Sequence, residues 1–114
     1  MEDPKGLKLF KEVVMKTKAG RIKWEAAANE SEYFAVLPGG VTLSMLTWEE
    51  RGTWGWTPRI ALIVRGDDAE FLRITPEVDG ITCEQLTELH ELARRQALSV
   101  DARVDKLLGE LAKL

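Results

Sequence analysis

The apolar run from Ile60 to Val64 predicts a strand near the middle of a β-sheet. β-Branched side chains dominate this run, and a sequence that is apolar at every position is typical of a strand covered on both faces. The turn residues Gly66-Asp67-Asp68 follow, and residues 69–74 resume the apolar pattern until Pro76 ends it. Residues 58–76 therefore predict the central hairpin of an antiparallel sheet.

Apolar residues at helical spacing, including Leu7, Phe10 and Val14, predict a helix of about four turns before Gly20. Alternation of apolar and polar positions then predicts three further strands, at residues 21–26, 33–37 and 41–48. The glycine-rich, aperiodic stretch 49–57 is interpreted as a connecting loop.

The segment after Pro76 carries a clear helix start. Thr82 and Gln85 have the spacing of a capping box, and Ile81 and Leu86 have the spacing of a hydrophobic staple. The apolar positions that follow keep helical phase to the end of the chain: Leu86, Leu89, Ala93, Ala97, Val100, Val104, Leu107 and Leu111. This pattern fits one long helix from Cys83 to Lys113 or two helices separated at Ser99. We favour two, because Ser99 is a suitable N-cap and because a single helix of about 45 Å is longer than a small compact domain is wide.

The order of these elements predicts an α+β fold. An N-terminal helix precedes a four- or five-stranded antiparallel meander sheet, and one long or two short C-terminal helices pack on that sheet. With 114 residues, the whole of 1–114 is expected to form a single domain.

Composition narrows the class of protein. The chain is 45% hydrophobic and 31% charged, with a net charge of −3, which is typical of globular proteins. Its acidic balance argues against a nucleic-acid partner, and no apolar run is long enough for a membrane partner or span. The absence of a signal-like start and the single cysteine lead us to expect a cytoplasmic protein.

Three stretches resemble a group of small, uncharacterised bacterial proteins of about this length. They are LTELHELARRQALSVDARVDKLLGEL near the C-terminus, the earlier KAGRIKWE, and Leu37-Pro38-Gly39-Gly40-Val41. The resemblance implies a small bacterial cytoplasmic protein and supplies no functional residues.

Candidate catalytic groups are scarce. His90 is the only histidine and Cys83 the only cysteine; two helical turns separate them by about 10 Å, too far for a hydrogen bond. We expect Cys83 to be at least half-buried and unreactive. Asp67, Asp68 and Glu70 are interpreted as turn residues. We therefore predict that the protein is not an enzyme, with no catalytic residues, no metal site and no cofactor.

The remaining feature is exposed apolar surface. The C-terminal segment has more apolar side chains than one covered helix face needs, and Trp54 and Trp56 lie where a core role is not required. We predict a non-enzymatic module for protein–protein contact, most simply a homodimer, that uses Trp54, Trp56, Val104, Leu107, Leu108 and Leu111. The alternative is a small-molecule ligand held on the concave side of the sheet, with Trp54 and Trp56 at its mouth and Tyr33 or Arg73 as polar contacts.

Overall fold

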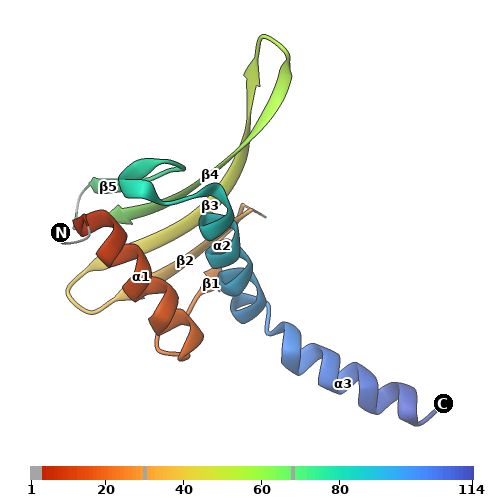
Figure 1. Cartoon of the computed structure of the whole chain (residues 1–114). Coiled ribbons are helices and arrows are strands. Elements are labelled where there is room, and N and C mark those ends of the chain that lie inside the picture. Colours follow the sequence, from red (N-terminus) through yellow and green to blue (C-terminus); the bar gives the residue numbers. More distant parts are fainter. Residues whose placement is uncertain (1–3, 30, 68) are drawn as a thin grey trace.

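The computed structural model, which describes residues 4–29, 31–67 and 69–114, has two layers and two projections (Figure 1). Helices α1 (Lys5–Lys18) and α2 (Cys83–Ala97) lie side by side over one face of a five-stranded sheet. A long β-hairpin and a third helix, α3 (Val100–Ala112), extend away from this body. The α+β fold predicted from the sequence is confirmed.

The sheet is an antiparallel meander whose spatial order, β1-β2-β3-β4-β5, follows the sequence. Its strands are β1 (Glu25–Ala26), β2 (Glu32–Leu37), β3 (Val41–Gly52), β4 (Gly55–Arg65) and β5 (Glu70–Ile74). β4 lies between β3 and β5, and residues 60–64 are all buried, as the continuous apolar run predicts. The prediction of a strand over 21–26 is too long, because only its last two residues pair with β2.

The core lies between the helices and the sheet face that they cover. Strands β2 to β5 contribute alternate residues, while α1 and α2 contribute one apolar face each. The largest fully buried side chains come from both layers: Leu43, Met45, Leu62, Ile74, Ile81, Leu86 and Leu89. Because the residues at both ends of the body supply the helix layer, the core depends on contacts between distant parts of the chain.

Trp24 joins the N-terminal helix to the rest of the core. Its indole is 3% exposed, and the indole N–H donates to the Thr17 hydroxyl at 3.0 Å. Its backbone N–H donates to the side-chain oxygen of Gln96 in α2 at 3.2 Å. A buried indole needs such a partner for its polar edge, so Trp24 ties α1, the entry to β1 and α2 together.

The start of α2 is the predicted capping box. The backbone N–H of Gln85 donates to the Thr82 hydroxyl at 3.1 Å, and the Thr82 N–H donates to the Gln85 side-chain oxygen at 2.9 Å. Ile81 and Leu86, the two residues of the predicted staple, are both fully buried. Local sequence therefore sets both the start of α2 and the direction in which the chain enters it.

The sequence interpretation of residues 49–57 as a connecting loop is wrong. β3 and β4 remain paired through this stretch as far as Gly52 opposite Gly55, and only Thr53 and Trp54 form the turn. Gly55 has φ +112, a conformation that favours glycine, so it allows the tight reversal. We call the paired residues 47–60 the β-arm; it projects well beyond the sheet (Figure 1).

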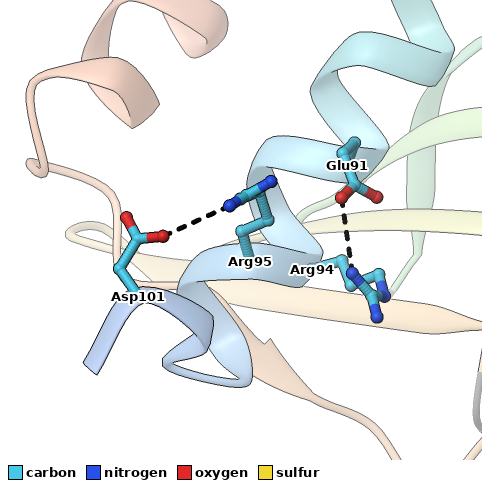
Figure 2. A network of polar contacts seen from close by, with 4 residues as sticks. All are labelled: Glu91, Arg94, Arg95 and Asp101. Carbon is cyan, nitrogen blue, oxygen red and sulfur yellow. Dashed lines mark hydrogen bonds and ion pairs between the residues drawn. The ribbon is translucent and has the colours of Figure 1, made fainter. Parts of the chain in front are cut away.

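The prediction of two C-terminal helices is confirmed, with the break at Ser99. Ser99 is left-handed, with φ 51 and ψ 45, and makes no side-chain cap bond. It ends α2 much as a C′ residue does, and its backbone carbonyl accepts from Arg103 in the next helix at 3.0 Å. Figure 2 shows an exposed ion pair between Arg95 and Asp101, at 3.3 Å, that spans this junction.

Of the two C-terminal helices, only α2 packs on the sheet. None of the residues of α3 is buried, and the helix points away from the body (Figure 1). The radius of gyration is 16.2 Å, compared with about 13 Å for a compact domain of this length. The break directs α3 away from the body. The prediction of a break is therefore correct, but the argument that a break keeps the domain compact is wrong.

Candidate functional site

One face of α3 carries four exposed apolar side chains. Val104, Leu107, Leu108 and Leu111, which we call the C-terminal stripe, are between 46% and 59% exposed. Their spacing places all four on one side of the helix. An amphipathic helix is normally stabilised by packing of its apolar face, yet this face meets no other part of the described chain.

The tip of the β-arm carries the second predicted set of residues. Trp54 is in the two-residue turn and is 99% exposed, while Trp56 lies on β4 opposite Arg51 and is 65% exposed. The ion pair between Arg59 and Glu50, at 3.0 Å, bridges the two strands nearer the body. The arm thus presents two large aromatic side chains at the end of a stalk whose side chains from Glu49 to Arg59 are exposed.

The structure does not bring the predicted ligand-binding residues together. Tyr33 pairs with Met45 on the helix-covered face and is buried, whereas Arg73 pairs with Ile63 on the opposite face. Trp54 and Trp56 lie beyond the sheet at the tip of the arm (Figure 1). The helix-covered face is occupied by the core, so these four residues do not form one site.

Cys83 and His90 border the same hollow, of about 260 Å³, between the first turns of α2 and the base of the β-arm. The His90 ring stacks edge-on against Tyr33, with ring centres 5.3 Å apart, and its Nε2 lies 3.1 Å from the Ser31 carbonyl oxygen. Cys83 is exposed, which corrects the expectation that it is at least half-buried. His90 therefore has a packing partner and a polar contact of its own, neither of which involves the thiol.

The described residues of the acidic turn before β5 provide no cluster of ligands. Glu70 pairs with Arg73 at 2.8 Å, the Asp67 carboxylate lies against Gly40 of the neighbouring turn, and Asp68 is outside the described residues. Over residues 4–29, 31–67 and 69–114, no three His, Cys, Asp or Glu side chains are placed to hold a metal ion. In the same residues, no helix has the length and apolar character needed to cross a membrane.

The Glu70–Arg73 pair predicts a small pH effect. The hydrogen bond from the Arg73 guanidinium lowers the pKa of the Glu70 carboxyl below its usual value. Because the folded-state pKa is the lower one, the stabilisation is present above the unfolded-state pKa and is lost as the pH falls through the folded-state pKa. We expect Arg73→Gln to raise the Glu70 pKa toward its ordinary value, as measured by NMR titration of the side-chain carboxyl. An unchanged titration curve would contradict this assignment.

Several exposed apolar residues, including Met15, Val36 and Phe71, were not singled out from the sequence. Met15 on α1 is 54% exposed, although its helix packs on the core through Phe10, Val13 and Thr17. Its position just outside the buried stripe of α1 is the signal that identifies it, because an apolar residue there faces away from the sheet.

Comparison of the chain with protein-family models, curated proteins and solved structures finds no significant match. Functional inference therefore depends on the exposed surfaces described above.

Proposed function

We propose that this protein is a non-enzymatic self-association module, and that the C-terminal stripe of α3 forms the contact between copies. The observation that supports the proposal is that no residue of α3 is buried. An isolated helix of this length is marginal in water, so packing of its apolar face is the expected source of its stability.

The size of the stripe is consistent with such a contact. Complete burial of a valine or leucine side chain contributes about 1.5–3 kcal/mol, and the four stripe residues are each about half exposed. Two copies therefore stand to gain about 6–12 kcal/mol from their stripes, which is comparable to the estimated cost of association, 4–15 kcal/mol. We expect a reversible dimer that depends on protein concentration.

Sedimentation equilibrium over a wide concentration range tests the proposal. We expect the wild-type chain to approach the mass of a dimer, and Leu107→Asp combined with Leu111→Asp to remain a monomer, because two buried carboxylates oppose contact. The matched control is Gly109→Asp with Lys113→Gln, which makes the same change in net charge on the opposite side of α3 and should still form a dimer.

Near-ultraviolet circular dichroism of the buried Trp24 shows whether each variant keeps a folded body. A wild-type chain that is monomeric at every concentration would contradict self-association. A monomeric wild type whose Leu107→Asp and Leu111→Asp variant unfolds would instead place the stripe within the core of its own chain.

Trp54 and Trp56 form a second protein-contact surface in this proposal, because exposed tryptophans are frequent interface anchors. The β-arm and α3 project in different directions (Figure 1). We therefore expect Trp54→Ser with Trp56→Ser to leave the mass of the dimer unchanged, which would assign the arm to a contact separate from self-association.

We also propose a cytoplasmic location. Its support is the exposed thiol of Cys83, the only cysteine of the chain, since exposed unpaired thiols are typical of reducing compartments.

A further inference from the structure

The outer surfaces of α1 and α2 form a groove with an apolar floor. It has a volume of about 350 Å³ and is lined by Phe10, Lys11, Val14, Met15, Lys18, Gln85 and Glu88. The half-exposed Met15 lies within it, and an ion pair between Lys18 and Glu88, at 3.2 Å, crosses it. A groove of this kind between two helices is suited to a third helix that lays an apolar face into it.

The groove and the C-terminal stripe have similar lengths. Along α1 the lining extends from Phe10 to Lys18, which corresponds to about 12 Å of helix. The stripe extends from Val104 to Leu111, or about 10.5 Å. A second hollow, of about 450 Å³, lies beside Lys18 and reaches Ser99 and Ala102 at the start of α3. The surface available to a helix therefore extends along the body as far as the point where α3 departs.

The charges on the two rims of the groove match those on the two sides of the stripe. Lys11 and Lys18 lie on the α1 rim and Glu88 on the α2 rim, while Glu84 and Glu91 line a neighbouring hollow that shares Glu88. At 100° per residue, Asp101 and Asp105 flank the stripe on one side. Arg103 and Lys106, with Glu110 among them, flank it on the other. One of the two possible directions of a docked helix therefore places the aspartates beside lysines and the basic residues beside glutamates.

A stable dimer needs a larger contact than two stripes can form with each other. This requirement favours binding of each stripe in the groove of the other copy. Standard interfaces involve about 20–30 residues from each partner, whereas one face of the 13-residue α3 offers far fewer. If each stripe enters a groove on the other copy, every chain contributes a stripe and a groove. The buried apolar surface then includes Phe10, Val14 and Met15 as well as the stripe.

On these grounds we propose that the occupant of the α1–α2 groove is the α3 helix of a second copy of this chain, in a reciprocal exchange about a two-fold axis. This inference rests on the proposed function, since it specifies where on the other copy the stripe binds. The left-handed Ser99 supports it, because Ser99 directs α3 away from the groove of its own chain and leaves both surfaces available.

Disulfide trapping between two single-cysteine chains tests the arrangement. Both chains carry Cys83→Ser; one also carries Met15→Cys and the other, made longer by a tag, carries Leu108→Cys. Under mild oxidation we expect a covalent heterodimer of intermediate size from the mixture. The matched control replaces Met15→Cys by Val36→Cys, at a residue that is 69% exposed on β2, and should give little heterodimer.

Sedimentation of Met15→Asp provides an independent measurement. We expect at least a tenfold weaker dimer with a folded body, since Met15 is outside the core.

If Leu108→Cys crosslinks mainly to itself and Met15→Asp leaves the dimer unchanged, the stripes pair with each other. The groove proposal is then overturned and self-association stands. If the wild type is monomeric throughout, self-association itself fails. An intrachain disulfide in a monomeric Met15→Cys/Leu108→Cys chain would show that α3 covers its own groove and would also overturn the exchange.

Discussion

Replacement of Trp24 by alanine is expected to lower the free energy of unfolding by about 3–5 kcal/mol, as for other large buried aromatic residues. The side chain is 3% exposed and its indole N–H donates to Thr17, so the substitution leaves both a cavity and an unpartnered hydroxyl. Domains of this size have a total stability of about 5–15 kcal/mol. Urea denaturation followed by far-ultraviolet circular dichroism, at one fixed protein concentration, measures the change.

Trp24→Phe separates the two parts of this loss. It fills most of the space but removes the donor to the Thr17 hydroxyl, which is buried, and we expect it to cost about 1–3 kcal/mol. Combining Trp24→Phe with Thr17→Val should cost less than the sum of the two single changes, because no hydroxyl is left unpaired. A loss below 1 kcal/mol for Trp24→Ala would contradict its place in the core.

Leu89→Ala is expected to cost about 2–5 kcal/mol, because Leu89 is completely buried between α2 and the sheet. Leu108→Ala is the matched substitution in α3. Measured at a concentration where the chain is monomeric, it should change the stability by no more than about 0.5 kcal/mol, as is usual for surface positions.

The contrast between these two leucines tests the division of the C-terminal segment into a buried helix and an exposed one. Both substitutions are followed by the same urea titration. Equal losses at Leu89 and Leu108 in the monomer would mean that α3 packs on the body, and would contradict the exposed position of the C-terminal stripe.

The sequence predicts the elements whose structure is set locally. The capping box at Thr82, the glycine at the end of α1 and the continuous apolar run in β4 each depend on neighbouring residues, and the structure confirms them. The sequence of residues 49–57, within the β-arm, predicts a loop because Gly52 and Gly55 are typical of loops. In the structure these glycines flank a two-residue turn, and pairing with the opposite strand extends β3 and β4 to it.

The direction of α3 depends on a property that apolar periodicity does not reveal. The apolar pattern keeps the same phase from Leu86 to Leu111, so it fits a continuous helix and a broken one equally well. The left-handed conformation of one residue, Ser99, determines where the second half points. For the same reason the pattern identifies the C-terminal stripe but not the surface that it meets, since the groove arises only when α1 and α2 pack together.

The position of α3 after all the core residues has a consequence for synthesis. Every buried residue of the core precedes Ser99, and translation proceeds at about 5–20 residues per second, so residues 100–114 are added over about one to three seconds. A ribosome has therefore already synthesised all the core-forming residues when the stripe is made. This order makes every core-forming residue available before the stripe that we propose joins two copies.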